Sequence, residues 1–489
     1  MSHQKSVLVA VLAIALVGLG FRLEVARHAL PMDDALITLR YAKNLIDGHG
    51  LVYNVGEAVM GSTAPLYAVM LAVPLALTRD PLLTLDALPL VFDLLTLGLL
   101  LWTPLLAAKP INRLPYAAAF ASAWFAAAAV GYGMETQAFV LFLFLARILI
   151  GSERPLAAGL ILGSAGLLRP EAAIAALVFS ARLRGSSTWV RAVVGVVLPL
   201  AAWILVATIV YGDPVPHSVH AKSTLGHSTF DDWLGFFVLR NPVLALLWVL
   251  AVGALVDRST PAFVRDFVAL SFGLGAFYLI TRPVFFGVWY FPPVGFGLLL
   301  GATAFGAALL RRATASIPRF GAEQIAIVIT VGWLALGTIT LGRVRANALG
   351  FAPNVTEVYL PLAERIAEDD RDDVTAIASD IGYVGYFCDC TIIDAGALVS
   401  PQVLAVYRSE DAETKNIVDV FEPDWYASPV NNGVHATFSL SSASSAYEAV
   451  ARFQKYGDNT LPIIEDPSAE YRRTPEYVGD FVLYRRIED

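Results

Sequence analysis

The sequence predicts a polytopic α-helical membrane protein with a water-soluble domain at its C-terminal end. Hydrophobic residues make up 57% of the 489 residues and charged residues only 16%, against about a quarter in soluble proteins. Long apolar stretches fill the chain up to about residue 342. Beyond that point the polarity is mixed, with acidic runs such as residues 368–370. We therefore expect a membrane domain over residues 1–342 and a soluble α/β domain over residues 343–489.

The apolar stretches define the expected transmembrane helices. A spanning helix needs about 20 apolar residues. About eleven stretches qualify, several of them short, near residues 6–22, 83–107, 114–132, 135–150, 155–168, 171–182, 191–211, 234–256, 264–281, 290–310 and 322–342. The fifth and sixth meet at a break, which a membrane tolerates where the backbone lines a cavity. The run from Ala64 to Leu77 is about 14 residues long and starts with Pro65, so we expect it to be re-entrant or interfacial.

Lysine and arginine residues predict the orientation, because short loops rich in them stay in the cytoplasm. With the N-terminus inside, the loops around Lys109, Arg154, Arg182, Arg258 and Arg311 all fall on the cytoplasmic side. An odd number of spans then places the C-terminal domain outside a plasma membrane. Five polar segments emerge together on that outer face and are expected to form one site: Met32 to Gly61, Gly131 to Thr136, Arg169 to Glu171, Gly212 to Lys222 and Arg282 to Pro293.

Charge and cysteine content narrow the function classes. The net charge of -8 and the lack of a basic cluster argue against nucleic acid as a partner. Cys388 and Cys390 are separated by one residue, which is too close for an ordinary disulfide or a zinc pair. We expect both to be structural or incidental thiols.

Two adjacent carboxylates, Asp33 and Asp34, directly follow the first span. Ionisable groups at a membrane boundary are costly enough to indicate function. One aspartate would suffice to cap the following helix, whereas a pair lets one take a proton from a hydroxyl while the other tunes its pKa or helps hold Mg²⁺, Mn²⁺ or Ca²⁺. The residues alone leave both interpretations open. The helix that follows is amphipathic and interfacial, with Arg40 on its polar side and Gly48 at its end.

The next outer segments add acids and histidines. Glu135 opens a span, where a helix dipole would also stabilise it. Arg169 and Glu171 lie at the break between two short spans, where they can simply neutralise each other. His217 and His220 have the spacing of a metal-binding pair on a helix, but no third ligand is evident nearby.

Cations and aromatic rings complete the set. Lys222 suits a phosphate as a point charge, and Arg282 can donate to two phosphate oxygens. Trp289 and Tyr290 can stack on a sugar ring, although an aromatic belt with a snorkelling arginine is an equal alternative. Acids, cations and aromatics beside hydrocarbon favour a polyprenyl-phosphate sugar, whose tail stays in lipid while its phosphate lies at the interface. No P-loop, dinucleotide fingerprint or zincin motif favours another chemistry.

The order of five motifs resembles bacterial members of the GT-C superfamily. They are DDALITLRYAKNLIDGHGLVYN, GMET, LLRPEA, YGDPVPHSVHAK and IGYVGYFCDCTIIDAGALVSP, between about Met32 and Pro401. The similarity is to the branch of terminal arabinofuranosyltransferases, and more distantly to protein mannosyltransferases and aminoarabinose transferases. It implies a GT-C-like glycosyltransferase that transfers a sugar with inversion from a polyprenyl-phosphate donor. The base would be Asp33, which takes the first position of the D-D motif, with Asp34 in support.

The resemblance also distributes the other roles. The sugar would be arabinofuranose or another pentose or hexose, and the acceptor a glycan, glycolipid or protein of the cell envelope. The expected ligands of the donor phosphate are Arg282, Lys222, Arg169 and Arg40. The expected substrate contacts are Glu135, Glu171, His217, His220, Trp289 and Tyr290. Relatives often have asparagine at the position of His217 and an aromatic residue at that of His220, and only some depend on a divalent cation, so a metal at the two aspartates stays open.

Two other function classes make different predictions. A transporter or flippase of lipid-linked sugar predicts internal repeats, and no convincing repeat of the D-D segment is found. A non-catalytic membrane scaffold gives no reason for paired acids beside an interfacial helix.

In the C-terminal domain we expect strands at Val374 to Ala378, Thr391 to Ile393 and Phe481 to Tyr484, with a glycine-rich turn at Asp380 to Gly385.

Overall fold

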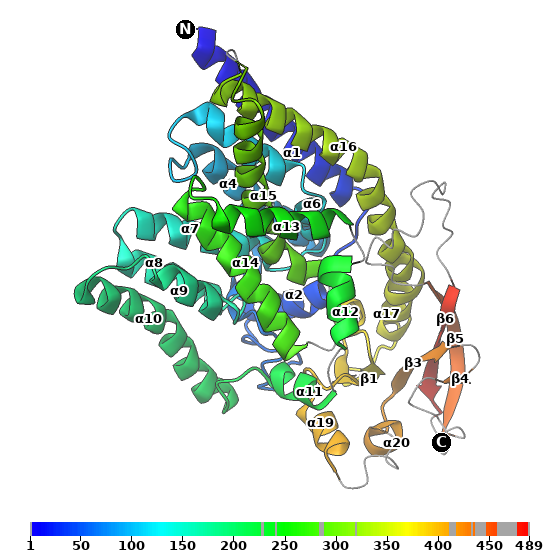
Figure 1. The fold of residues 1–489 in the computed structure, drawn as a ribbon. Helices are drawn as coiled ribbons and strands as arrows, with labels where there is room; N and C mark the ends of the chain where they lie inside the picture. The colour runs from blue at the N-terminus through cyan, green and yellow to red at the C-terminus, as the bar shows by residue number, and fades with distance from the viewer. Residues whose placement is uncertain are drawn as a thin grey trace.

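The computed structural model describes residues 2–225, 229–239, 242–282, 288–317, 320–409, 417–431, 434–435, 446–456 and 477–487. In the membrane domain the helices are α1 (Ser2–Ala26), α2 (Asp33–Ile46), α3 (Pro65–Thr78), α4 (Pro81–Trp102), α5 (Leu114–Ala121), α6 (Trp124–Gly131), α7 (Thr136–Gly151), α8 (Pro155–Gly166), α9 (Ala172–Ser180), α10 (Ser186–Tyr211), α11 (His217–Leu225), α12 (Phe230–Leu234), α13 (Pro242–Val256), α14 (Ala262–Thr281), α15 (Phe291–Ala313) and α16 (Ala322–Asn354). They form one bundle beside which the C-terminal domain lies (Figure 1).

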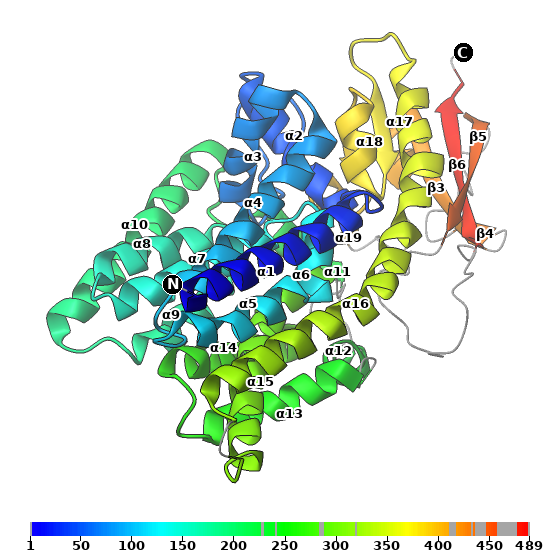
Figure 2. The ribbon, with the colours of Figure 1, turned by 90° about the horizontal axis from the view of Figure 1, so that it is seen from above.

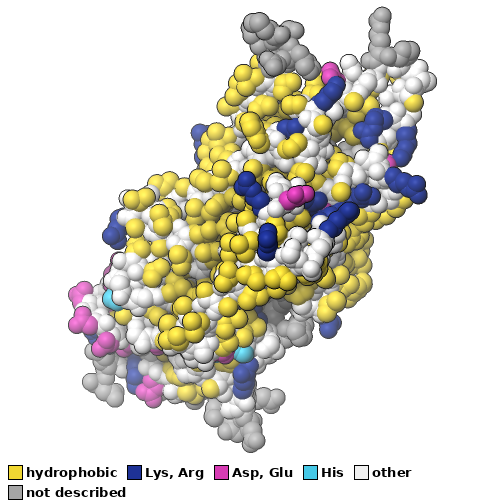
Figure 3. Space-filling model, turned by 90° about the vertical axis from the view of Figure 1, so that its left-hand side faces the viewer, with side chains coloured by type: hydrophobic (Ala, Val, Ile, Leu, Met, Phe, Trp, Pro, Cys, Tyr) yellow, Lys and Arg dark blue, Asp and Glu magenta, His cyan; other side chains and the backbone are white. Residues whose placement is uncertain are grey.

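The polytopic helical fold is confirmed. Six described helices are long and apolar enough to cross a membrane, or up to eight if each bent helix pair counts as one span. The other expected spans correspond to the shorter helices α7, α8 and α9. Hydrophobic side chains cover much of one face of the bundle, as a lipid-facing surface requires (Figure 3). The chain is therefore a multi-pass membrane protein.

Local sequence signals explain where several helices begin. Proline stands in the first turn of α3, α4 and α8, where its missing amide hydrogen costs nothing. Asp80 caps α4 by accepting a hydrogen bond from the Leu83 amide at 2.9 Å. Small residues let helices approach closely: a Cβ added to Gly159 of α8 would lie 2.1 Å from the Ala192 carbonyl oxygen of α10.

Buried charges inside the bundle are paired, as the low dielectric of a membrane demands. The Arg22 guanidinium of α1 lies 2.7 Å from the Asp93 carboxylate of α4, and neither side chain is exposed. Elsewhere in the bundle, Arg147 of α7 and Arg182 both contact the Asp266 carboxylate of α14, each at 2.6 Å. These pairs tie helices that are distant in sequence.

The C-terminal domain is built around a small mixed sheet. Its elements are a π-helical turn (Val355–Tyr359), α17 (Leu360–Ala367), β1 (Thr375–Ala378), α18 (Ile381–Phe387), β2 (Thr391–Asp394), α19 (Pro401–Tyr407), α20 (Ile417–Phe421), β3 (Trp425–Asn431), β4 (Val434–His435), β5 (Tyr447–Tyr456) and β6 (Tyr477–Arg486). The strand order is β2-β1-β3-β6-β5, with β1 parallel to β2 and β3, and β6 antiparallel to β3 and β5. The three expected strands are confirmed, and α16 continues past the expected boundary at residue 342.

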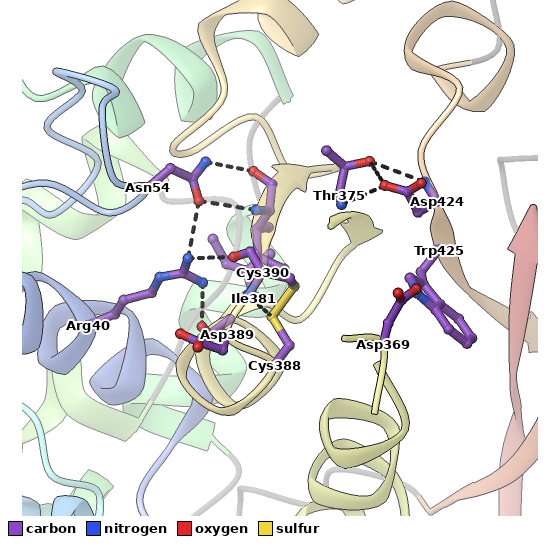
Figure 4. The surroundings of a disulfide bond; sticks show 12 residues. Arg40, Asn54, Asp369, Thr375, Ile381, Cys388, Asp389, Cys390, Asp424 and Trp425 are labelled. Carbon is purple, nitrogen blue, oxygen red and sulfur yellow. Dashed lines mark hydrogen bonds between the residues drawn. A yellow bond between two sulfur atoms is a disulfide. The ribbon is translucent and has the colours of Figure 1, made fainter. Parts of the chain in front are cut away.

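Two expectations in this domain were wrong. Residues 380–385 do not form a turn but begin helix α18, which packs on α2 (Figure 2). A side chain at Gly382 would collide with the Asp33 backbone of α2, and one at Gly385 would collide with the Tyr53 hydroxyl and the Arg40 guanidinium. Cys388 and Cys390 are not free thiols but form a disulfide, despite the single residue between them. The close spacing is accommodated because the pair lies in the irregular segment between α18 and β2 (Figure 4).

Arg40 of α2 holds this part of the C-terminal domain. Its Nε donates to the Tyr53 carbonyl at 2.8 Å and its Nη2 to the Cys390 carbonyl at 2.7 Å, while Nη1 donates to the Gly385 carbonyl. Nη2 also contacts the Asn54 amide oxygen at 3.3 Å (Figure 4). The side chain is buried, and this residue, which was expected to bind the donor phosphate, joins the two domains.

Candidate functional site

One cavity of about 190 Å³ lies where the membrane domain meets the C-terminal domain. Each of the five polar segments that were expected to converge contributes to its lining, which confirms that convergence. The lining residues are Asp34, Ile37, Thr38, Gly61, Ser62, Thr63, Ala64, Met134, Glu135, Arg169, Pro170, Glu171, Ser218, Lys222, Trp289, Tyr290 and Leu398. Seven of the twelve expected site residues are therefore in one place: Asp34, Glu135, Arg169, Glu171, Lys222, Trp289 and Tyr290.

The two adjacent aspartates have different surroundings. Asp34 lines the cavity. Asp33 instead turns to the C-terminal domain, where its two carboxylate oxygens accept hydrogen bonds from the amides of Gly382 and Tyr383, both at 2.8 Å. It thereby caps α18, because those amides lie in the first turn of that helix. The geometry thus favours Asp34, not Asp33, as the acid that meets a substrate.

Both aspartates have raised pKa values. Desolvation raises the pKa of Asp34 above its ordinary value, Lys222 opposes this rise, and Asp380 adds to it. Burial raises the pKa of Asp33 to about 8, and the charge of Asp380 adds to the rise, against the two amide hydrogen bonds. A carboxylate with a raised pKa is a stronger base once it has lost its proton.

A buried ion-pair cluster forms one wall of the cavity. Arg169 donates to Glu135 at 3.1 Å and to Glu171 at 3.2 Å, and the Tyr278 hydroxyl donates to Glu171 at 2.9 Å. The Arg169 guanidinium also lies 5.0 Å from the centre of the Tyr290 ring. Two carboxylates compensate one guanidinium here, so Arg169 has little charge left for a phosphate. Its Nε atom is buried and makes no hydrogen bond within the described structure.

Lys222 brings a positive charge to the cavity. It lies on α11, next to Ser218 one turn earlier, and it acts electrostatically on both Asp34 and Tyr290. Ser218 is buried, and its hydroxyl makes no hydrogen bond within the described structure. An ammonium group beside a hydroxyl can stabilise the negative charge of a leaving group.

Five expected site residues lie outside the cavity lining: Asp33, Arg40, Arg282, His217 and His220. Arg40 is engaged by carbonyls of the C-terminal domain and by the Tyr53 carbonyl, as described above. Arg282 is exposed at the end of α14, next to residues 283–287, which lie outside the described residues. His220 pairs with Asp213 at 3.0 Å, and the His217 amide donates to the Met60 carbonyl at 2.7 Å. These contacts indicate that both histidines position α11.

The aspartate pair does not fit a two-carboxylate cation site. Both oxygens of Asp33 accept backbone amides, which leaves Asp34 without its neighbour as a second ligand. Among the described residues, no group of three or more histidines, cysteines or acids is arranged to hold a metal ion.

The sequence did not reveal that the C-terminal domain contributes to the site. Leu398 reaches the cavity from the loop of residues 394–400, which we call the roof loop. The buried Asp394 carboxylate holds this loop by accepting the amides of Gly396, Leu398 and Val399 at 2.7, 2.5 and 3.1 Å. Burial raises the pKa of Asp394 to about 6, against these three amides. In the sequence this loop shows only a DAG segment, and the fold is needed to see that Leu398, two residues after it, lines the cavity.

The roof loop is fixed to the membrane domain at Gly61. A Cβ at Gly61 would lie 2.5 Å from the Val399 side chain and 2.7 Å from the Leu398 carbonyl oxygen. The Gly61 amide in turn donates to the Tyr41 hydroxyl at 2.6 Å. A larger residue at position 61 would push the roof loop away from the cavity.

No protein-family model and no curated protein matches the chain. Solved structures of ArnT from Cupriavidus metallidurans share its architecture. The apo-state structure has a TM-score of 0.60 at 14% identity, covering 92% of this chain and 97% of that one. The structure bound to undecaprenyl phosphate has a TM-score of 0.56 at 14% identity, covering 81% and 88%. At this identity the likeness concerns the fold alone, and this chain shares the overall fold of those ArnT structures.

Proposed function

We propose that the protein is a membrane glycosyltransferase that transfers a sugar from a polyprenyl-phosphate donor to a hydroxyl of a cell-envelope glycan, glycolipid or protein. One observation carries the proposal: Asp34 and Lys222 line the same cavity as the rings of Trp289 and Tyr290. This set supplies a base for the acceptor, a cation for the departing phosphate, and rings for the sugar. The ArnT structure bound to undecaprenyl phosphate supports a lipid-linked partner for this fold.

In the proposed mechanism Asp34 takes the proton of the acceptor hydroxyl as its oxygen attacks the anomeric carbon. The bond between that carbon and the phosphate oxygen breaks on the opposite side, so the sugar inverts its configuration. The electron pair leaves with the polyprenyl phosphate, and Lys222 stabilises the added negative charge. Glu135, Arg169 and Glu171 keep the cavity wall in place through their mutual ion pairs.

We place the site on the outer side of the plasma membrane. The lysine and arginine pattern supports this orientation, and so does the disulfide between Cys388 and Cys390, because disulfides persist in oxidising compartments. We further propose that residues 1–342 form the catalytic membrane domain and that residues 343–489 form an outer domain that covers it. Arabinofuranose is one candidate sugar, on the motif resemblance.

The decisive test is transfer of labelled sugar by the purified protein in lipid. Synthetic polyprenyl-phosphate pentoses and hexoses would be offered with cell-envelope acceptors, and the product's anomeric configuration would be determined. We expect transfer with inversion from at least one donor. Movement of lipid-linked sugar across the bilayer without transfer would instead identify a flippase.

Replacing Lys222 by methionine is expected to lower kcat about 100-fold, as the loss of one charge-stabilising group at a reacting centre typically does. Because Lys222 lowers the pKa of Asp34, the variant's activity should also rise at higher pH than that of the wild type. Lys43→Met is the matched control. Lys43 lies outside the cavity lining, and its ammonium makes a long ion pair of 3.9 Å with the exposed Asp389. An unchanged pH profile with normal kcat would remove Lys222 from the mechanism.

Asp394→Asn is expected to raise the KM for the acceptor about tenfold with a smaller effect on the KM for the donor. The amide group cannot accept all three roof-loop hydrogen bonds, so Leu398 loses its fixed position above the cavity. Steady-state kinetics with each substrate varied in turn would measure the split. Asp389→Asn, at a side chain that is 94% exposed, is the control. Equal changes for donor and acceptor would show that the loop does not select the acceptor.

A further inference from the structure

A second cavity, of about 140 Å³, lies at the other end of the helix bundle. Its lining includes Ala322, Ile325 and Ile329 from the first turns of α16, whereas the last turn of α16 joins the C-terminal domain. Figure 1 shows that this end of α16 lies near the N-terminus, far from the C-terminal sheet. The cavity is therefore separate from the candidate active site and serves none of the roles proposed above.

The cavity has a polar mouth. Arg311, in the last turn of α15, lines it and makes a long hydrogen bond of 3.3 Å to the Ser259 hydroxyl. Asn112 lines it too, and its side-chain oxygen is buried without a hydrogen bond within the described structure. A guanidinium binds anions, and a buried amide oxygen is stabilised by accepting a hydrogen bond. A ligand that satisfies both carries a negative charge and a hydroxyl or ammonium group.

The inner walls are apolar. Ala304 and Ala307 of α15 and Ala326 of α16 face the cavity together with the two isoleucines of α16. Neighbouring side chains on α16, such as Ile327 and Val331, are exposed on a helix long and apolar enough to cross a membrane. One wall of the cavity is therefore a helix whose outer side chains meet hydrocarbon. A free inorganic anion would gain nothing from such walls, whereas an acyl chain would.

We propose that this cavity binds a glycerophospholipid from the surrounding leaflet. Its phosphate accepts hydrogen bonds from Arg311, a headgroup hydroxyl or ammonium donates to the Asn112 side-chain oxygen, and the upper part of an acyl chain lies between α15 and α16. The site belongs to the membrane domain at the end remote from catalysis, and it does not depend on the proposed transferase activity.

The test is native mass spectrometry of the purified full-length protein with phosphatidylglycerol, which carries both a phosphate and hydroxyl donors. Arg311→Gln is expected to weaken binding about tenfold, the usual effect of losing a charge-assisted hydrogen bond. Arg312→Gln is the matched control, because the adjacent Arg312 is engaged with Asp257 at 2.8 Å and does not line the cavity. Ala307→Leu, which fills the cavity from a half-buried position, is expected to weaken binding as well.

A separate arm distinguishes the source of the phosphate. Inorganic phosphate at millimolar concentration is expected neither to displace the lipid nor to raise the thermal midpoint of the protein in detergent. If phosphate alone reproduces the effect, the cavity binds a soluble anion and the lipid proposal is wrong. It is equally wrong if Arg311→Gln and Ala307→Leu, with thermal midpoints like that of the wild type, retain phosphatidylglycerol as the Arg312→Gln control does.

Discussion

Asp34→Asn is expected to lower sugar transfer about 1,000-fold while the protein stays folded. Asparagine has nearly the same shape but cannot accept the acceptor's proton, and a positioned general base typically contributes 100- to 10,000-fold. Donor binding should persist, because Lys222, Trp289 and Tyr290 remain in the cavity. Single-turnover transfer of labelled sugar, with donor affinity measured separately, would separate the two effects.

The pH dependence gives an independent readout of the same residue. A base acts only when deprotonated, so activity is lost as the pH falls through the pKa of Asp34. Desolvation in the cavity raises that pKa, and hence the loss should begin at a higher pH than an ordinary aspartate would give. Residual activity of Asp34→Asn should lack this ascending limb.

Asp33→Asn is the matched control for Asp34→Asn. Its side chain would still accept one of the two amide hydrogen bonds from α18, so we expect most of the activity to remain and stability to fall by about 1 kcal/mol. The opposite outcome, with Asp33→Asn inactive and Asp34→Asn active, would restore the first aspartate of the motif as the base.

The proposed exchange of roles between these neighbouring aspartates shows a limit of what the sequence can predict. The length of the apolar stretches and the positions of the basic loops predicted the helical membrane fold. The alternation of loops between the two sides of the bilayer predicted which polar segments meet. Both predictions were possible because these features depend on the bilayer. The choice between Asp33 and Asp34 depends on helix α18, almost 350 positions away, whose first amides Asp33 caps. No local pattern carries that information.

Contacts between residues far apart in the sequence also explain the roles of Arg40 and Leu398, which the sequence did not predict. Arg40 lies on the polar side of an amphipathic interfacial helix and was expected to bind the donor phosphate, yet it donates to the carbonyls of Gly385 and Cys390 in the C-terminal domain. Leu398 has no distinguishing feature in the sequence, and only the fold shows that it lines the cavity. Contacts between the two domains could not be predicted from the sequence, whereas most of the polar residues expected at the membrane boundary do lie together.

The interface that decides these roles depends on a glycine. Gly382→Ala is expected to destabilise the protein by about 3 kcal/mol, toward the upper end for overpacking a close contact. The new Cβ would fall 1.8 Å from the Asp33 carbonyl oxygen, and backbone cannot rotate aside as a side chain can. Helix α18 would have to move away from α2, which would also break the cap that Asp33 provides.

Thermal unfolding in detergent measures this effect, and Gly306→Ala is its control. Gly306 lies in α15, where an added Cβ meets no atom within 4 Å, so that substitution should be neutral or slightly stabilising. Gly382→Ala should also lower transfer activity more than stability alone explains, because the roof loop belongs to the same domain as α18. A variant with normal stability and normal activity would mean that α18 does not hold the C-terminal domain against the active site.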